Sequence, residues 1–142
     1  TIQAEILELL QELQKEYKMS ILIVTHNLGV VATIADRVVV MYGGKIMETG
    51  TTEEIFYEPR HPYTKALLET IPEAEERKKK LPVIPGTPPN LINPPKGCPF
   101  MARCPKRMNI CGMSFPKKNE RCYCYLYDER CKREFGSGLK DE

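Results

Sequence analysis

The first residues of the chain follow a helical pattern, and a short apolar run comes after it. Apolar side chains recur every three or four residues between positions 2 and 17, which predicts a helix with one apolar face. That face carries Ile6, Leu9, Leu10, Leu13 and Tyr17. Residues 21–24, ILIV, form a continuous apolar run that is typical of a buried strand in a parallel sheet covered by helices.

A second helix and a β-hairpin are predicted next. Asn27 is a suitable N-cap for a short helix through Ala35, because its side-chain oxygen can accept a hydrogen bond from a backbone N–H group of the first turn. Residues 38–42 (VVVMY) and 45–49 (KIMET) predict two strands. The Gly-Gly pair between them is typical of a two-residue hairpin turn.

Two further helices complete this part of the pattern. Thr51 and Glu54 have the spacing of a capping box, which predicts a helix that ends before Pro59. Pro62 suits a first helical turn and predicts a helix over residues 63–70. The expected order is helix, buried strand, helix, hairpin, helix and helix, which is an α/β arrangement.

Composition divides the 142 residues into zones. Residues 1–71 carry the α/β pattern, and residues 72–97 form a charged and proline-rich linker. Residues 98–131 hold all six cysteines in an irregular module, and residues 132–142 form a tail that we expect to be disordered. A chain of this length fits one ordinary domain or two small ones.

Charge and hydropathy exclude two classes of function. A formal net charge of +2 argues against nucleic-acid binding driven by overall charge. The basic run over residues 77–80 follows an acidic stretch, so we interpret it as a solvated helix end. The longest apolar runs are far shorter than the roughly 20 residues that a transmembrane helix needs.

One histidine occupies a position that favours a functional role. His26 directly follows the apolar run, and the carboxyl ends of strands in open α/β sheets are where ligands bind. Position alone is weak support, because a lone histidine is more often a hydrogen-bonded structural residue. The surrounding sequence, ILIVTHNLGVVATIADRVVVMYGGKIMETGTTEEIF, resembles the stretch around the switch histidine of ABC-transporter ATPases. The resemblance implies that His26 is the catalytic residue that senses the γ-phosphate of ATP.

The resemblance also implies that the chain is a C-terminal fragment of a P-loop ABC nucleotide-binding domain. The sequence contains no GxxxxGK(S/T) phosphate loop, no LSGGQ-like signature and no buried strand that ends in Asp-Glu. The chain also begins inside a helical pattern, so we expect a longer parent protein. ATP and Mg²⁺ would belong to that intact ATPase, and the 142-residue chain alone should be inactive.

A second resemblance identifies the branch of the family. Residues 58–70, EPRHPYTKALLET, are similar to the segment that follows the nucleotide-binding domain in oligopeptide and dipeptide importers. This implies an ATP-hydrolysing subunit that energises peptide uptake from the cytoplasmic face of the membrane. Its implied partners are a second ATPase subunit, permease subunits and a separate solute-binding protein. We interpret His61 as a surface or helix-cap histidine without a catalytic role.

The cysteine spacing leaves three alternatives open. Six cysteines in a small proline-rich module could form three disulfides. They could bind zinc, although the C-x₂₋₄-C pairs of most structural zinc sites are absent. They could also hold an iron–sulfur cluster, which needs four thiolates.

The family resemblance selects among these alternatives. GCPFMARCPKRMNIC is similar to the C-terminal motif of the importer ATPases, some of which carry a 4Fe–4S cluster. The implied ligands are Cys98, Cys104, Cys111 and Cys124, with zinc as the alternative metal and Cys122 as a competitor for the fourth position. An ATPase that faces the cytosol also disfavours persistent disulfides.

Two other functions remain as alternatives. The chain could be a stand-alone cysteine-rich metal or redox module, which would leave the ABC-like stretch unexplained. It could also belong to an ABC ATPase for another solute, such as nickel or an oligosaccharide. Whether the ABC ATPase serves peptides or another solute, we expect isolated chains to pair or aggregate, because the apolar run at 21–24 lacks its sheet neighbours.

Overall fold

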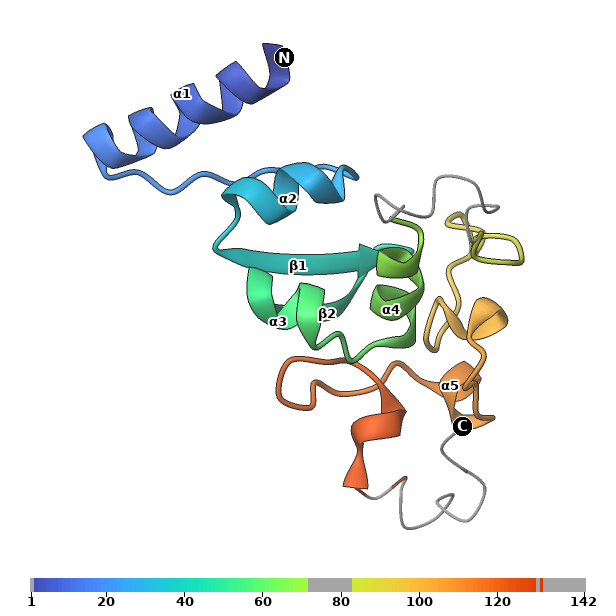
Figure 1. Ribbon diagram of the computed structural model, residues 1–142. Helices are drawn as coiled ribbons and strands as arrows, with labels where there is room; N and C mark the ends of the chain where they lie inside the picture. Colours follow the sequence, from blue (N-terminus) through green and yellow to red (C-terminus); the bar gives the residue numbers. More distant parts are fainter. Residues whose placement is uncertain (1, 72–82, 130, 132–142) are drawn as a thin grey trace.

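A computed structural model describes residues 2–71, 83–129 and 131 (Figure 1). Most of its regular structure lies in the first half of the chain. The elements are α1 (Ile2–Tyr17), α2 (Leu28–Ile34), β1 (Arg37–Tyr42), β2 (Lys45–Thr51), α3 (Thr52–Tyr57), α4 (Pro62–Glu69) and α5 (Ile110–Met113), with 3-10 turns at Met101–Arg103 and Tyr125–Tyr127.

The predicted β-hairpin is confirmed. Strands β1 and β2 pair antiparallel, with an irregularity in the register between Val40 and Met41. Gly43 and Gly44 form the turn with φ angles of 54° and 75°. Glycine adopts such left-handed conformations without steric cost, which explains the two consecutive glycines at this turn.

The predicted helix starts are confirmed by their caps. The Asn27 side chain accepts hydrogen bonds from the backbone N–H groups of Gly29 and Val30, at 3.0 and 3.3 Å. Thr51 and Glu54 form the reciprocal capping box at the start of α3. These local bonds satisfy backbone donors that a helix leaves unpaired, so the sequence determines where α2 and α3 begin.

Helices lie on both sides of the hairpin. Figure 1 shows α2 on one side of β1, with α3 and α4 on the other. Met47 on β2 and Ile55 on α3 are almost completely buried, and they form part of the core with Phe100 from the second half of the chain. The core therefore lies between the hairpin, the helices that follow it and the cysteine-containing module.

The strand predicted at residues 21–24 is not formed. The chain runs from α1 to α2 as an extended segment without strand pairing (Figure 1), and the two-stranded hairpin is the sheet of the described residues. Leu22 and Val24 are 92% and 94% exposed. A strand needs hydrogen-bonding neighbours, and no described segment supplies them here, so the predicted parallel sheet is absent from this structure.

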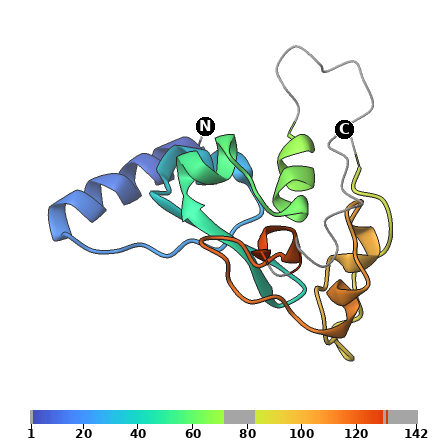
Figure 2. The ribbon, with the colours of Figure 1, turned by 90° about the horizontal axis from the view of Figure 1, so that it is seen from below.

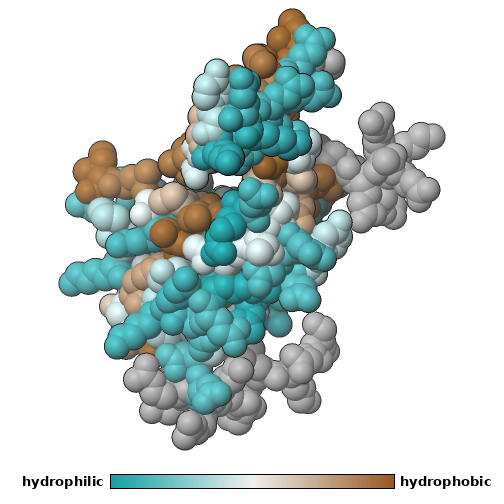
Figure 3. Space-filling model, turned by 90° about the vertical axis from the view of Figure 1, so that its left-hand side faces the viewer, coloured by the Kyte–Doolittle hydropathy of each residue, from teal (hydrophilic) through white to brown (hydrophobic). Residues whose placement is uncertain are grey.

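The predicted first helix is confirmed, but its apolar face is not covered. Helix α1 contains no buried residue and stands apart from the body of the molecule in Figure 1. Leu9 is 53% exposed although it lies on the predicted apolar face. Figure 3 shows apolar side chains exposed on this side of the molecule.

The second half of the chain folds mainly through irregular segments (Figure 2). It attaches to the hairpin by backbone hydrogen bonds, because Thr49 N–H donates to the Arg121 carbonyl at 2.8 Å and Tyr123 N–H donates to the Met47 carbonyl at 2.9 Å. Residues 121–123 thus lie along the edge of β2.

Parts of the predicted linker and tail lie outside the described residues. These parts are residues 72–82, which include the basic run, and residues 132–142. Residues 83–97 of the linker contain no helix or strand, as their proline content predicts. No helix in the described ranges combines the length and apolarity required to cross a membrane.

Candidate functional site

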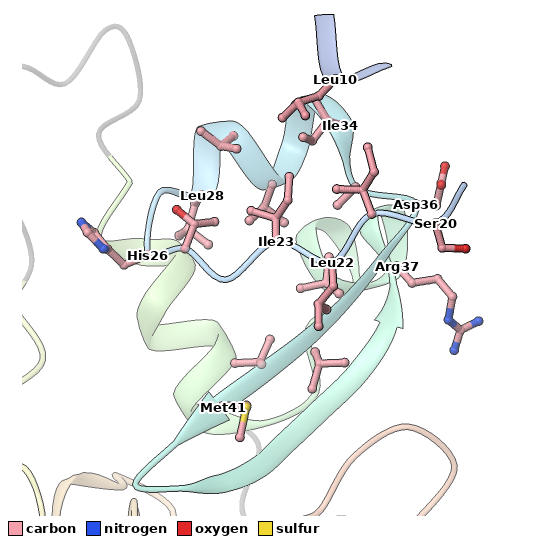
Figure 4. A pocket seen from close by; sticks show the side chains of 18 of the residues that line it. Leu10, Ser20, Leu22, Ile23, His26, Leu28, Ile34, Asp36, Arg37 and Met41 are labelled. Atoms are coloured by element: carbon pink, nitrogen blue, oxygen red, sulfur yellow. The ribbon is translucent and has the colours of Figure 1, made fainter. Parts of the chain in front are cut away.

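The first candidate site is an apolar groove with His26 at one end. Its volume is about 490 Å³, and its walls come from α1, the segment between α1 and α2, α2 itself and β1. Most of its lining side chains are apolar, among them Leu22, Ile23 and Ile34. In Figure 4 the His26 ring lies at the end of the groove near α4 and points away from this apolar lining.

A local turn positions His26. The Asn27 side chain caps α2, and the Asn27 backbone N–H donates to the Thr25 hydroxyl at 3.0 Å. His26 lies between these two anchored residues and is exposed to solvent. The backbone on both sides of His26 is therefore anchored, while its imidazole is exposed.

The groove offers little else that could bind a nucleotide. Asp36 and Arg37 lie at the opposite end from His26 in Figure 4. Phosphate binding in P-loop proteins relies on a run of backbone N–H groups and a lysine, and the described lining residues include no lysine. His26 could supply a single hydrogen bond to a phosphate oxygen, but the groove alone is not a nucleotide site.

The second candidate site is a small cavity surrounded by thiols. Cys98, Cys104, Cys111 and Cys124, which are the four predicted ligands, all line it together with His61. The volume of the cavity is about 20 Å³, close to the space of one water molecule. Cysteines from separate segments thus line one small cavity.

Short turns and one close backbone contact position these thiols. Cys98 N–H donates to the Cys111 carbonyl at 2.7 Å, and Cys104 ends the 3-10 turn Met101–Arg103. A Cβ atom on Gly97 would lie 2.0 Å from the Cys111 carbonyl oxygen, so only glycine permits this approach. Gly97 therefore allows the loop to close around the cavity.

Two opposing effects act on the thiols of the cavity. Burial raises the pKa of Cys98 to about 12 and the pKa of Cys104 to about 11. The backbone N–H groups of Phe100 and Lys106 bond to these two sulfur atoms and partly offset that rise in pKa. Binding a metal centre would replace the protons on these thiols, while the N–H groups would still stabilise the thiolates.

Cys124, not Cys122, faces the other three cysteines. Cys122 is fully buried against β2 and is not part of the cavity wall. A hydrogen bond from Cys122 lowers the pKa of Cys124. The two cysteines thus have different environments although only one residue separates them.

The pairing and arrangement of the cysteines limit what this cavity holds in the structure. No disulfide joins any of the six cysteines, so the three-disulfide alternative is not realised. Across residues 2–71, 83–129 and 131, no three His, Cys, Asp or Glu side chains are arranged to hold a metal ion. Four thiols are the donor number of a 4Fe–4S cluster and also of a four-cysteine zinc site, and the cavity would have to widen to contain a cluster.

His61 forms part of the cavity wall, which sequence reasoning did not predict. The helix-cap interpretation is confirmed, because Nδ1 accepts a hydrogen bond from Tyr63 N–H at 3.0 Å. The surface interpretation is wrong, since His61 is only 1% exposed. Burial lowers its pKa to about 4, so the imidazole is neutral at physiological pH.

A buried carboxylate that the sequence did not reveal holds this region together. Glu48 on β2 is fully buried and accepts hydrogen bonds from the backbone N–H groups of Arg60 and His61, both at 2.9 Å. The Arg121 guanidinium lies 3.7 Å from the same carboxylate. The only signal in the sequence is a charged residue in the middle of a predicted strand.

Comparison with known proteins shows what the sequence of this chain is similar to. Residues 47–111 match the model of the oligopeptide/dipeptide transporter, C-terminal region. The chain is 49% identical over 143 aligned positions to the dipeptide transport ATP-binding protein DppD of Bacillus subtilis, covering 97% of this chain and 43% of that protein. The chain is therefore similar over nearly its whole length to a dipeptide transport ATP-binding protein.

Two other relatives are also ATP-binding proteins of peptide transport. The oligopeptide transport ATP-binding protein OppD of Bacillus subtilis is 58% identical over 111 residues, which are 78% of this chain and 31% of that protein. The OppD protein of Salmonella typhimurium is 48% identical over 116 residues, with 82% and 35% coverage. The chain thus spans less than half the length of these relatives.

The family match covers the two sites unequally. The matched C-terminal region of the oligopeptide/dipeptide transporter family begins at β2 and ends at Cys111. It includes Glu48, His61 and three of the four predicted cysteine ligands, whereas His26 and Cys124 lie outside it. The sequence resemblance to this branch is confirmed, while the roles predicted for His26 and for the cysteines stay predictions.

Proposed function

We propose that the chain is the C-terminal part of the ATP-hydrolysing subunit of an oligopeptide or dipeptide ABC importer. The observation that carries this proposal is the similarity of 97% of the chain to a dipeptide transport ATP-binding protein. The intact subunit would act on the cytoplasmic face of the membrane with a second ATPase subunit, permease subunits and a solute-binding protein.

In this proposal His26 contacts the γ-phosphate of ATP. A phosphoryl-transfer transition state spreads negative charge over the phosphate oxygens, and it is stabilised by hydrogen-bond donors held in fixed positions. The anchored backbone between Thr25 and the N-cap Asn27 supports this role, because it presents the exposed imidazole at a defined point of the chain. The phosphate loop, the signature and the magnesium ligands would come from other parts of the subunit.

The open groove supports the same proposal. Leu22 and Val24 are almost fully exposed, and α1 has no buried residue. Exposed apolar surface of this kind usually marks an interface. We infer that the remaining strands and helices of a nucleotide-binding domain cover it, which would pair the 21–24 segment as a strand.

ATP binding and hydrolysis test this assignment. The chain alone should show no tight binding in a nucleotide titration, because it lacks a phosphate loop. In a subunit where a phosphate loop precedes this chain, His26→Ala should lower kcat by about 10²- to 10³-fold. The free energy of unfolding should change by less than about 0.5 kcal/mol, because His26 is exposed.

Tight ATP binding by the chain alone, or full ATPase activity in the His26→Ala subunit, would contradict the proposed role. The matched control is Lys45→Ala, which removes an exposed charged side chain from the hairpin away from the groove. It should leave kcat unchanged.

We further propose that Cys98, Cys104, Cys111 and Cys124 hold a 4Fe–4S cluster. Their convergence on one cavity and the N–H groups directed at Cys98 and Cys104 support this assignment. Such a cluster would cross-link a module that has little regular structure of its own. The cavity walls are short turns, so we expect them to move apart when the cluster binds.

Metal analysis after anaerobic purification tests the cluster. We expect about four iron atoms per chain and a visible absorption shoulder. Cys124→Ser should lose most of the iron, whereas the matched control Cys122→Ser should retain it, because only Cys124 faces the other ligands. Zinc without iron would establish the alternative metal, and a metal-free protein would exclude both.

A further inference from the structure

Residues 83–89, which we call the strap, lie beside the turn of the β-hairpin without regular structure of their own. Val83 and residues 85–88 are exposed to solvent, and only Ile84 and Pro89 are partly buried. Fixing an irregular segment costs conformational entropy, which its contacts with the rest of the chain must offset. The contacts of the strap therefore decide whether it stays in place.

One arginine makes the polar contacts between the strap and the hairpin. The Arg103 guanidinium donates from Nε to the Pro85 carbonyl at 2.9 Å and from Nη2 to the Ile84 carbonyl at 2.5 Å. Its Nη1 donates to the hydroxyl of Tyr42, at the end of β1, at 3.0 Å. Within the described ranges, no other hydrogen bond joins the strap to the rest of the chain. The planar guanidinium thus connects two successive carbonyls of the strap to the hairpin.

Two glycines allow the strap to lie close to its neighbours. Gly86 has a φ angle of 90°, and a Cβ atom there would lie 3.1 Å from Cγ of Arg103. Any other residue would be strained in this conformation and would crowd the arginine. A Cβ atom on Gly43, in the hairpin turn, would lie 3.2 Å from Cγ of Pro89. Glycine at both positions therefore lets the strap close on the Arg103 side chain and on the turn.

The core of the cysteine module uses other contacts. Phe100 is fully buried and packs edge-on against Tyr42 with centroids 5.4 Å apart. Cys98 N–H donates to the Cys111 carbonyl at 2.7 Å. These contacts involve neither Arg103 nor the strap, so the strap can open while the module keeps its core.

We propose that residues 83–89 form a releasable strap and that Arg103 holds it closed on the hairpin. Because most of the strap is exposed, water can bond to the Ile84 and Pro85 carbonyls once the guanidinium releases them. Opening then gives slack to the connection between α4 and the module without unfolding either. A guanidinium stays charged at physiological pH, so the strap opens by a conformational fluctuation and not by titration. The device needs neither nucleotide nor metal, and it thus goes beyond the proposed function.

Two substitutions should open the strap by different routes. Arg103→Lys keeps the positive charge but removes the planar group that bonds to two carbonyls and to Tyr42 at once. Gly86→Ala keeps Arg103 but places a side chain in a left-handed conformation. The matched control is Arg107→Lys, the same substitution at an exposed position four residues further along the chain.

NMR relaxation of the full chain measures the mobility of the strap. In the unsubstituted chain we expect order parameters of about 0.85 at the Ile84 and Thr87 amides. The Arg103 Nε–H should exchange with water about tenfold more slowly than the Arg107 Nε–H. Arg103→Lys and Gly86→Ala should lower the order parameters below about 0.6, whereas Arg107→Lys should leave them unchanged.

Hydrogen exchange of the Cys98 amide shows in the same samples whether the module stays folded. This amide is bonded to the Cys111 carbonyl, so it exchanges slowly only while the module is closed. Its exchange rate should be the same in all variants. A mobile strap together with a protected Cys98 amide is the expected result.

Two results would overturn the proposal. An equally rigid strap in Arg103→Lys and in the unsubstituted chain would show that Arg103 does not hold it. Loss of Cys98 protection together with the order of the strap would show that the strap cannot open by itself. If Arg103→Lys does not fold, Gly86→Ala decides by the same two measurements with Arg103 in place. All of these results are independent of ATP binding and of iron content, so they leave the proposed function untouched.

Discussion

Two regions of the molecule contrast in how their sequence patterns relate to their packing. Residues 2–35 carry a regular helical pattern and an apolar run, yet α1 contains no buried residue and Leu22 is 92% exposed. Residues 97–127 have little regular structure, yet Phe100 and Cys122 in this region are fully buried. The strongest sequence pattern thus lies in the most open part of the structure.

The difference shows that periodicity predicts an element but not its partner. An amphipathic helix gains stability only when its apolar face is covered. The irregular module instead makes specific contacts with the hairpin and with α3. Phe100 packs edge-on against Tyr42 of β1 with centroids 5.4 Å apart, and the Arg121 guanidinium donates to the carbonyl of Glu54 in α3 at 2.9 Å. These contacts make it part of a common core.

The largest expected effect tests the closed region. Phe100→Ala should lower the free energy of unfolding by about 3–5 kcal/mol, because it leaves a cavity among the side chains that join the module to the hairpin. Urea unfolding of the full chain measures this. Met113→Ala is the control, since Met113 in the same region is 74% exposed and should change stability by less than about 0.5 kcal/mol. Equal losses of unfolding free energy in the two variants would show that the module has no core.

Acid should destabilise the closed region through His61. Its pKa is about 4 in the folded chain and 6.5 when exposed, so the unfolded state binds more protons between these values and stability falls as the pH falls. Between pH 7 and pH 4 the expected loss is about 3 kcal/mol. Urea unfolding of the unsubstituted chain should show this additional loss relative to His61→Asn, which lacks the titrating group; parallel pH profiles would contradict the prediction.

A smaller effect is expected at the joint between the two halves of the chain. Glu48→Gln keeps the shape of the side chain but loses the charge and places an N–H₂ group against a backbone N–H donor. We expect a loss of about 2 kcal/mol in the free energy of unfolding. The control is Glu53→Gln, the same substitution at an exposed position of α3. Similar urea midpoints for the two variants would argue against a role for the buried carboxylate.

The smallest effect is expected in the open region. Leu22→Ser should change the stability of this chain by less than about 0.5 kcal/mol, because Leu22 is already exposed. In a subunit that contains the rest of the proposed domain, the same substitution should cost about 1.5–3 kcal/mol. A large loss in the chain alone would mean that a second copy covers this segment, and size-exclusion chromatography would then show a dimer.

Local signals predicted most of the first half correctly. Gly43 and Gly44 specify the hairpin turn, Asn27 caps α2, and Thr51 with Glu54 starts α3. Each of these features depends on residues within a few positions of one another, so the sequence contains the whole cause. The strand at 21–24 failed because pairing needs a neighbour that is distant in the sequence.

The candidate sites divide in the same way. The family motif identified four cysteines, and the structure brings all four to one cavity. The motif did not reveal that His61 lines that cavity, because the pattern around His61 also fits an exposed helix cap. It also gave no sign that Glu48 is buried, since burial there depends on residues 60, 61 and 121.

The sequence by itself determined the helices, the hairpin, the similarity to peptide-transporter ATP-binding proteins and the candidate residues His26 and the cysteines. These features follow from short-range backbone preferences and from motifs whose residues are close together in the sequence. Only the tertiary structure decided which apolar faces are covered, which cysteine of the Cys122–Cys124 pair faces the others, and which polar side chains are buried. Burial and convergence arise from contacts between distant residues, and those contacts have no local pattern in the chain.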